Sequence, residues 1–310
     1  MGHKRFTLCI TVLVILVFLA STAAIASEAK SGKKVAIQFL ALRFGTLGYA
    51  STFGLADLIN KHSSFLKATA VETKGTIANA RTLAEEPSAR KNTVILNTLS
   101  VKDIAEKAKP PFKDPYDGLR AISVAYRVAG CLVTLDPKIK SGKDLVGKKI
   151  GVGKKGSTSA LYPEVVLKYG YGVWDKLKSV QYLGYKESYD ALRGGTLDAA
   201  LFNNIIPGIS APAVKEFIES VPSFYTINIP PEIINKAREK SGVPIYPASM
   251  PARAVSPKQK EAYHGFAFTI GWWADKQLPD KVAYEITRVW PRERKRISIR
   301  ALSSFIRRRA

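Results

Sequence analysis

Three short clusters of glycine, threonine and serine have the residue types that could bind an anion. Gly45–Gly48, Lys74–Thr76 and Gly156–Ser159 each follow an apolar run and open a helical pattern. Such a turn brings together free backbone N–H groups, hydroxyl donors and the positive end of a helix dipole, so it can hold an anion without a metal or a catalytic base. A single cluster is also typical of a plain helix cap, but three in one chain predict a binding protein.

Residues for catalysis are scarce by comparison. His62 and His264 are the only histidines beyond the first few residues, and neither has the His/Cys spacing of a metal site. The chain has no Gly-x-Ser-x-Gly elbow and no phosphate-binding lysine motif. Residues 151–156 match Gly-x-Gly-x-x-Gly, but a lone match of this kind says little. We therefore expect no enzyme, no metal and no cofactor, with a secreted enzyme as the least favoured alternative.

The N-terminus has the layout of a secretory signal peptide over residues 1–26. His3, Lys4 and Arg5 precede the apolar stretch Leu8–Ala20, and small residues follow up to Ala26. An uncleaved membrane anchor is the alternative, but a bilayer span takes about 20 apolar residues, and the small residues favour cleavage after Ala26. We expect an exported chain whose mature part is soluble.

Charge and cysteine content narrow the function further. The net charge is +23, and part of it lies in a basic C-terminal tail, residues 291–310, which we expect to be poorly ordered. A basic protein attracts anionic ligands, but nucleic-acid binding would need stacking aromatics between the basic residues, so we expect no nucleic-acid partner. Cys131 is the only cysteine after the signal and lies in a buried-strand pattern, which predicts a core residue and not a nucleophile.

The elements that must position the three clusters form two alternating series of strands and helices. Strand patterns cover residues 35–42, 67–72, 93–96, 119–135, 149–153, 180–183 and 197–202, with helical patterns between most of them. The proline-rich break 109–115 separates the two series, because neither a helix nor a central strand accommodates it. This alternation predicts an α/β fold with a mainly parallel sheet. Asn203 follows the last of these strands, at the edge where open α/β sheets bind ligands.

Several stretches, taken in order, carry a resemblance to a known family. After the signal peptide they are Gly45–Tyr49, Ala56–Asn60, Glu72–Thr76 with Asn79, Ile139–Gly153, Gly156–Thr158, Tyr189–Leu192, Gly195–Phe202 and Pro279–Thr287. Together they resemble the extracytoplasmic solute receptors of the TAXI group of TRAP transporters. The resemblance covers most of residues 35–290, and the order and spacing of the stretches make it specific.

The resemblance implies a two-lobed, type II periplasmic-binding-protein fold with a cleft between the lobes. Lobe 1 would comprise residues 27–120 and 230–290, and lobe 2 residues 121–229. A receptor of this group would act in the periplasm as a monomer and capture a small anionic solute, such as glutamate, 2-oxoglutarate or a similar carboxylate. It would then deliver the solute to a TRAP membrane permease subunit. The substrate-binding subunit of an ABC importer is the alternative, because it shares the fold class and differs mainly in its membrane partner.

The resemblance also places residues of this chain in the cleft. The predicted ligand-binding residues are Thr46, Gly48, Tyr49, Gly75, Thr76, Asn79, Thr98, Ser157, Thr158, Phe202 and Asn203. Backbone N–H groups and hydroxyls would hold carboxylate oxygens, while Tyr49 and Phe202 would cover the apolar part of the solute. Thr76 and Ser157 as plain caps, and Tyr49 as a packing residue, stay open as alternatives. Arg43 is a candidate for added positive charge, and Arg81 is expected to face solvent.

Overall fold

The computed structural model describes residues 34–205 and 209–294. The predicted signal peptide, residues 1–26, and most of the predicted tail, residues 295–310, lie outside the described residues. The first part of that tail continues the last helix up to Arg294. Over the described ranges, no helix has the length and apolar character needed to cross a membrane.

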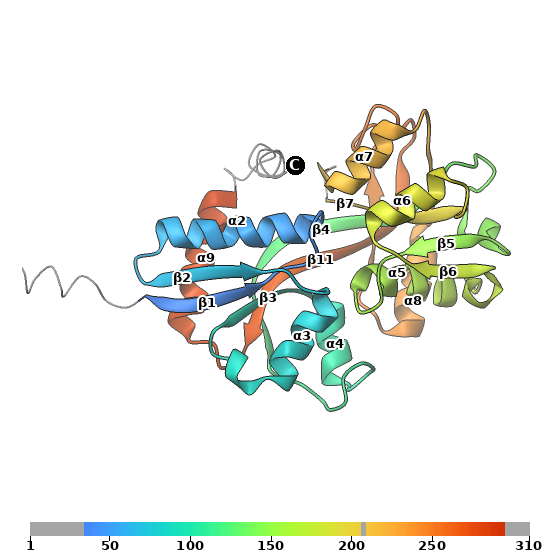
Figure 1. Cartoon of the computed structure of the whole chain (residues 1–310). Coiled ribbons are helices and arrows are strands. Elements are labelled where there is room, and N and C mark those ends of the chain that lie inside the picture. Colours follow the sequence, from blue (N-terminus) through green and yellow to red (C-terminus); the bar gives the residue numbers. More distant parts are fainter. Residues whose placement is uncertain (1–33, 206–208, 295–310) are drawn as a thin grey trace, which may run out of the picture.

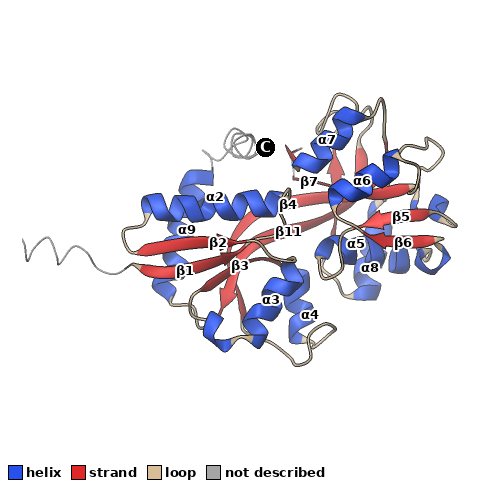
Figure 2. Cartoon of the chain, in the orientation of Figure 1, coloured by secondary structure: helices blue, strands red, loops and turns tan. Residues whose placement is uncertain are grey.

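Strands and helices alternate along much of the chain (Figure 1 and Figure 2). The strands are β1 Val35–Leu40, β2 Leu66–Val71, β3 Thr93–Thr98, β4 Leu119–Thr134, β5 Lys149–Val152, β6 Ser179–Tyr182, β7 Ala199–Ile205, β8 Ile209–Ser210, β9 Tyr225–Ile227, β10 Tyr246–Met250 and β11 Tyr263–Asp275. The helices are α2 Leu47–His62, α3 Thr76–Glu85, α4 Leu99–Glu106, α5 Thr158–Val165, α6 Tyr185–Arg193, α7 Pro212–Ser220, α8 Pro231–Ser241 and α9 Asp280–Arg294, with a π-helix at Val166–Tyr171 and short 3-10 helices at Pro87–Ala89, Gly142–Leu145 and Trp174–Lys176. The two predicted alternating series are therefore confirmed, with bounds that shift by a few residues.

All the strands within residues 34–205 and 209–294 belong to one mixed sheet of 11 strands. Its main order is β2-β1-β3-β11-β4-β7-β5-β6, and β10, β8 and β9 pair with β11, β7 and β4. β1 is parallel to β2 and β3, and β5 is parallel to β6 and β7. The centre is antiparallel, because β11 pairs in opposite direction with β3 and β4, and β4 with β7. The predicted parallel sheet is correct at each end and wrong in the middle, since the pattern of a buried strand does not encode its direction.

Two long strands connect the two ends of the sheet. β4 has 16 residues and β11 has 13, and they pair from Gly130 opposite Phe266 to Leu119 opposite Asp275. In Figure 1 both strands pass through the middle of the molecule and join its left-hand and right-hand parts. We call β1–β3 with α2–α4 and α9 the β1 end, and β5–β7 with α5–α7 the β5 end.

Helices cover both faces of the sheet at the β1 end. β3 is buried along its whole length, and successive side chains of a strand point to opposite faces. Leu96 therefore packs in the cluster that contains Leu55 of α2 and Val289 of α9, whereas Ile95 packs with Ile77 of α3. This two-sided burial explains the continuous apolar pattern of the strand, which is typical of a central strand in an α/β sheet.

The helix α8 lies with the β5 end. It contacts the π-helix at Val166–Tyr171 and also α5 and β10, although the sequence analysis assigned its residues to the first lobe. The two helices approach closely at Gly170, because a Cβ atom there would lie 2.8 Å from the side chain of Ile233. The exact lobe limits at 120/121 and 229/230 stay a prediction, since β4 and β11 pass through both ends without a break.

Candidate functional site

A cavity of about 450 Å³ lies between the β1 end and the β5 end. The β1 end contributes the turn after β1 and the turn before α3, and the β5 end contributes the starts of α5, α6 and α7. The lining residues are Leu42, Arg43, Phe44, Gly45, Thr46, Glu72, Lys74, Gly75, Thr76, Gly153, Lys154, Ser157, Thr158, Ser159, Leu183, Gly184, Tyr185, Lys186, Glu187, Pro212, Ala213 and Glu216. This volume lies within the ordinary range of small-molecule sites.

Five helices begin at this cavity, and four of their N-termini lack a side-chain cap. In α2 the hydroxyl of Thr46 accepts a hydrogen bond from the backbone N–H of Tyr49 at 3.1 Å. In the part of the chain that the structure describes, no side chain caps α3, α5, α6 or α7 in this way. The first N–H groups of α3, α5 and α6 therefore have no side-chain partner from their own caps, whereas α7 begins with Pro212, which has no N–H. The positive ends of all four dipoles lie at the cavity, which favours an anionic ligand.

The starts of α3 and α5 approach each other across the cavity at Gly75. This residue has φ 135° and ψ −179°, a conformation that essentially only glycine adopts. A Cβ atom there would lie 3.3 Å from the carbonyl oxygen of Gly156 and 3.4 Å from Cβ of Ser157. Gly75 therefore serves two purposes. Its backbone angles need a glycine, and the absence of a side chain lets the starts of α3 and α5 lie close together.

The start of α5 is tied to β5 by a hydrogen bond that a proline makes available. Pro163 lies inside α5. Proline has no N–H, so the carbonyl of Ser159, four residues earlier, lacks its helical partner. The backbone N–H of Gly153 donates to that carbonyl at 3.2 Å instead. The proline therefore helps to fix the turn that carries Ser157 and Thr158.

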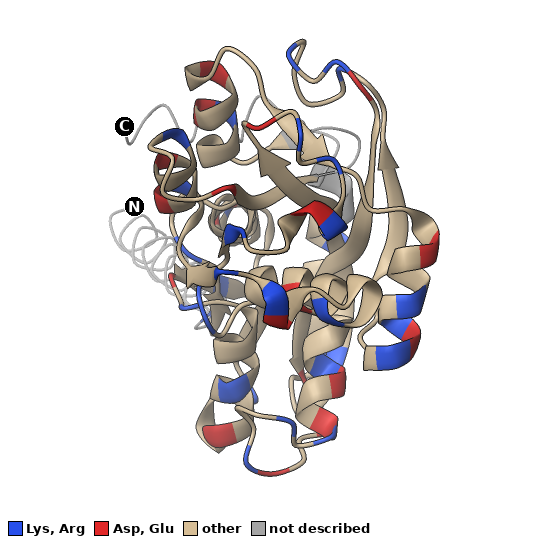
Figure 3. Ribbon diagram, turned by 90° about the vertical axis from the view of Figure 1, so that its right-hand side faces the viewer, with Lys and Arg blue, Asp and Glu red and all other residues tan. Residues whose placement is uncertain are grey.

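The walls of the cavity carry charges of both signs. Four basic side chains, including Arg43 and Lys74, face three acidic ones, and Figure 3 shows basic and acidic residues interspersed on the helices of the β5 end. Two of these acids already have partners on the same end, since Lys154 lies 3.6 Å from Glu187 and Lys186 lies 3.4 Å from Glu216. Burial lowers the pKa of Arg43, against the raising effect of Glu187 and Glu72. Arg43 is still charged, because an arginine does not lose its proton in proteins.

The structure brings five of the predicted ligand-binding residues to the cavity. They are Thr46, Gly75, Thr76, Ser157 and Thr158. Arg43 also lines the cavity, whereas Arg81 forms an exposed ion pair with Glu85 on α3. The six other predicted residues do not line the cavity; they are Gly48, Tyr49, Asn79, Thr98, Phe202 and Asn203.

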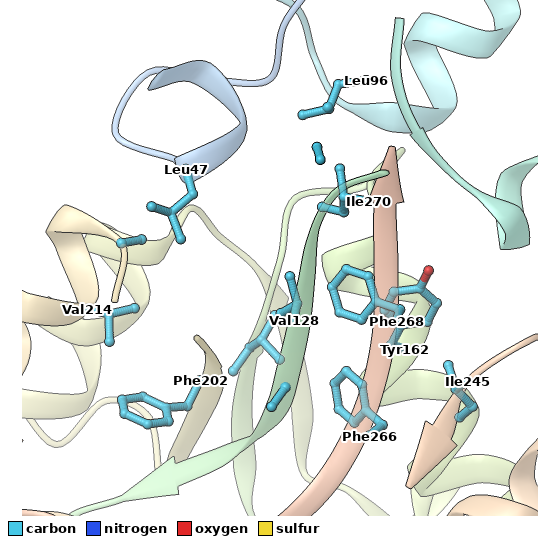
Figure 4. Packing of buried hydrophobic residues seen from close by; sticks show 14 of the residues in the cluster. Leu47, Leu96, Val128, Tyr162, Phe202, Val214, Ile245, Phe266, Phe268 and Ile270 are labelled. Atoms are coloured by element: carbon cyan, nitrogen blue, oxygen red, sulfur yellow. The ribbon is translucent and has the colours of Figure 1, made fainter. Parts of the chain in front are cut away.

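Three of those six residues pack inside the protein. A Cβ atom on Gly48 would lie 2.4 Å from the side chain of Leu42, so this glycine allows α2 to approach the turn before it. Tyr49 stacks on Phe53 with ring centroids 4.2 Å apart. Phe202 is fully buried, 5.6 Å from the ring of Phe224, and Figure 4 shows its ring within the packed core.

The remaining predicted residues have buried polar atoms without a partner. Among the described residues, six buried side-chain atoms have no hydrogen-bond partner, and four of them belong to predicted site residues. These four are Thr76 Oγ1, Asn79 Oδ1, Thr98 Oγ1 and Asn203 Oδ1, beside Asn97 Nδ2 and Trp272 Nε1. An unpartnered buried polar atom is costly and therefore rare in folded proteins. Of the four, Thr76 lines the cavity, so its hydroxyl can form a hydrogen bond with a molecule held there.

Asn79 also has a structural role that the sequence does not reveal. Its amide nitrogen donates to the backbone carbonyls of Ala41 at 3.0 Å, Leu40 at 3.2 Å and Leu96 at 3.3 Å, so it joins the ends of β1 and β3. We expect Asn79→Ala to lower the free energy of unfolding by about 1–3 kcal/mol, because buried carbonyls lose their donor. Urea denaturation measures this, with Arg81→Ala on the exposed side of α3 as a control that should change it by less than about 0.5 kcal/mol. An unchanged value for Asn79→Ala would contradict the structural role.

Sequence reasoning missed the wall formed by α6 and α7. Tyr185 is the first residue of α6, and its hydroxyl accepts from Asn203 Nδ2 at 2.9 Å and lies 3.3 Å from Ser159 Oγ. This contact connects the predicted Asn203 to the cavity through a second residue. Gly184 after the strand pattern and Pro212 at a helix start were visible signals, because both residue types are common at helix N-termini. Residues 34–205 and 209–294 hold no His, Cys, Asp and Glu grouping suited to a metal ion.

The sequence profile of the NMT1-like family matches residues 44–297. The match spans most of the chain and includes all of the helix starts at the cavity. The chain belongs to the NMT1-like family. This is the family of TAXI-type TRAP transporter solute receptors, as the sequence stretches indicated, and its members are solute-binding proteins without enzymatic activity. No match was found among curated proteins.

Solved structures show that this NMT1-like receptor has the fold of type II periplasmic binding proteins, as predicted. A structure described as a periplasmic transporter has 13% sequence identity and a TM-score of 0.52, and the alignment covers 82% of this chain and 81% of that chain. R. palustris Rpa4515 with adipate has 17% identity and a TM-score of 0.51, with 84% and 82% covered.

Proposed function

We propose that this receptor captures a small carboxylate between its two lobes and delivers it to a TRAP permease. The observation that carries the proposal is the convergence of four uncapped helix N-termini on one cavity, with the unpartnered hydroxyl of Thr76 beside them. With the predicted lobe 1 at residues 27–120 and 230–290 and lobe 2 at 121–229, α3 belongs to lobe 1, and α5, α6 and α7 belong to lobe 2. A ligand at this point would touch both lobes.

A carboxylate fits this arrangement for electrostatic reasons. Backbone N–H groups at helix starts donate hydrogen bonds and carry part of the positive end of the dipole. Arg43 and Lys74 add full positive charges on the β1 side of the cavity. Hydrogen bonds to a charged group contribute about 1.5–3 kcal/mol each, so a few of them reach the roughly 8 kcal/mol that a micromolar dissociation constant represents.

The proposed contacts come from both sides of the cavity. The turn at Gly75 and Thr76 would hold carboxylate oxygens from lobe 1, and Ser157 with Thr158 would do so from lobe 2. Apolar atoms of Leu183, and of Pro212 and Ala213 at the start of α7, line the same space and would contact the carbon chain of the solute. The six predicted residues that do not line the cavity would contact the solute only if the bound molecule reached deeper between the lobes.

The export route, the oligomeric state, the solute and the membrane partner are inferred from the family and the sequence. The receptor would be exported by the signal peptide at residues 1–26, act in the periplasm as a monomer and use glutamate, 2-oxoglutarate or a similar carboxylate. A TRAP permease subunit would be its membrane partner. An ABC importer would be a second candidate partner, and a neighbouring gene for an ATPase would favour it, whereas a large multi-span permease gene without an ATPase would favour TRAP.

A thermal-shift screen tests the solute class. Purified protein is heated with glutamate, 2-oxoglutarate, adipate and other small mono- and dicarboxylates, each at millimolar concentration. We expect at least one of them to raise the melting temperature, because a ligand present at 100 times its dissociation constant stabilises the folded state by about 2.7 kcal/mol. Neutral amides of the same carbon chains serve as matched controls and should have no effect. A screen in which no carboxylate raises the melting temperature would refute the carboxylate assignment.

A further inference from the structure

A buried hydrogen bond joins the two lobes away from the cavity lining. The hydroxyl of Ser100, at the second position of α4, lies 3.0 Å from the hydroxyl of Tyr162 in α5. Ser100 is 2% exposed and Tyr162 is fully buried. The two residues are 62 positions apart in the chain and belong to opposite ends of the sheet. Because neither hydroxyl is in contact with bulk water, the bond exists only while α4 and α5 are packed together.

The ring of Tyr162 is held by contacts that do not depend on its hydroxyl. It packs 4.4 Å from the ring of Phe268 and 5.8 Å from that of Phe266, both on the crossing strand β11. Figure 4 shows the three rings together, with the tyrosine oxygen at the outer end of its ring. Burial raises the pKa of Tyr162 to about 12, against the lowering effect of the neighbouring side chains of Ser100, Thr98 and Thr158. The hydroxyl therefore stays neutral near pH 7 and can donate or accept.

Tyr162 is linked to the proposed solute site through its own helix. Thr158 lies four residues earlier, on the same face of α5, and lines the cavity. The start of α5 also meets the start of α3, where the site of a Cβ atom on Gly75 lies 3.3 Å from the carbonyl oxygen of Gly156. Any movement of α5 away from α4 therefore separates the two helix starts that face the solute.

We propose that Tyr162 and Ser100 form a built-in closing contact that positions the α5 N-terminus on lobe 1. In this view the closed arrangement is populated before a solute binds, and the solute supplies only the remaining bias toward it. A ligand that needs the closed form has an apparent dissociation constant equal to its intrinsic value divided by the closed fraction. Tyr162 is thus a positioning residue that sets affinity without touching the solute. Its effect on affinity rests on the proposed function, but its effect on the lobes does not.

The test measures the distance between the lobes in the absence of any solute. Spin labels are placed on cysteines that replace the exposed residues Lys91 in lobe 1 and Lys176 in lobe 2, with Cys9 replaced by serine and the fully buried Cys131 retained. Double electron–electron resonance then gives the populations of short and long distances. The variants are Tyr162→Phe and Ser100→Ala, which remove the same bond from opposite lobes, and the double variant.

Tyr189→Phe is the matched control. Tyr189 is also a buried tyrosine, and its hydroxyl donates to the carbonyl of Leu201 at 2.9 Å inside the β5 end. Its removal deletes a comparable hydrogen bond and leaves the contact between the lobes in place. A general loss of stability would therefore affect this variant as much as Tyr162→Phe, but only Tyr162→Phe should move the lobes.

We expect each single variant to lower the ratio of closed to open molecules by about fivefold, the effect of one net hydrogen bond. The double variant should show no more than the single ones, because all three lack the same bond. With a carboxylate found in the screen, Tyr162→Phe should raise the dissociation constant by the factor by which the closed fraction falls. A wild-type protein without a closed population, unchanged distances in Tyr162→Phe, or an equal shift in Tyr189→Phe would overturn the proposal. If the thermal-shift screen finds no carboxylate, the measured distances between the spin labels still test whether the contact of Tyr162 with Ser100 closes the lobes.

Discussion

We expect Thr76→Val to weaken carboxylate binding by about 10- to 100-fold, the loss of one hydrogen bond to a charged group. Thr76 is 2% exposed, and its hydroxyl has no partner among the described residues. Valine has nearly the same shape, so the start of α3 should stay in place. The solute-free protein should keep its melting temperature or gain slightly, because an unpartnered buried hydroxyl is removed. Isothermal titration calorimetry and thermal denaturation measure the two effects.

Thr82→Val on the same helix is the control for this experiment. The hydroxyl of Thr82 bonds to the carbonyl of Ala78 at 3.3 Å and lies outside the cavity lining, so its loss should leave affinity unchanged. Ser157→Ala should have a smaller effect than Thr76→Val, because the hydroxyl of Ser157 already donates to the carbonyl of Lys154 at 2.6 Å. Equal affinity of Thr76→Val and wild type would move the anion site away from the start of α3.

Gly75→Ala should reduce both stability and affinity. A residue with a side chain at φ 135° is strained by about 1–3 kcal/mol, and the new methyl group would press on Gly156 across the cavity. If the backbone at position 75 relaxes, the N–H groups at the start of α3 move. If the contact with Gly156 relaxes, the two lobes separate. We expect a free energy of unfolding lower by about 1–3 kcal/mol and an affinity lower by about tenfold or more, measured by urea denaturation and calorimetry.

Gly54→Ala is a matched control for this substitution. Gly54 lies within α2, and a Cβ atom there would have no neighbour within 4 Å. Alanine is the better helix former, so the free energy of unfolding should rise by about 0.5–1 kcal/mol while affinity stays the same. An affinity for Gly75→Ala equal to that of Gly54→Ala would show that the close approach at Gly75 does not matter for binding.

The direction of the strands at each end of the sheet explains why helix N-termini line the cavity. Parallel strands end at one edge, and the helices that follow them begin there. At the β1 end this brings the starts of α2 and α3 to the cavity, and at the β5 end the starts of α5 and α6. Because β4 and β11 cross between the ends, the two edges face each other. Helix dipoles from both lobes therefore point at the same small volume.

Much of the local structure could be predicted from the sequence. The apolar run predicted as a strand at residues 93–96 lies in β3, the residues between the strand patterns 180–183 and 197–202 form α6, and the Gly75-Thr76 turn opens α3. These features depend on hydrophobic spacing and on turn residues that are neighbours in the chain, so a single sequence contains them. The start of an anion-binding helix can be recognised for the same reason.

The position of each side chain relative to the cavity was less predictable. Phe202 follows the expected strand pattern, yet it faces the core and contacts Phe224, because each residue of a strand points to one of two faces. Tyr49 lies in the first turn of α2 and packs on Phe53. Tyr185 gave no clear signal, since its role depends on Asn203 and Ser159, which are distant in sequence.

The sequence by itself therefore determined the alternation of strands and helices, the family and the helix starts able to bind an anion. Only the tertiary structure decided which starts share a cavity, that α6 and α7 join α3 and α5 there, and that α8 packs on the β5 end. Local patterns reflect interactions between residues a few positions apart. The cavity arises where β4 and β11 bring distant segments together, and that depends on packing between residues whose distance in the sequence carries no periodic signal.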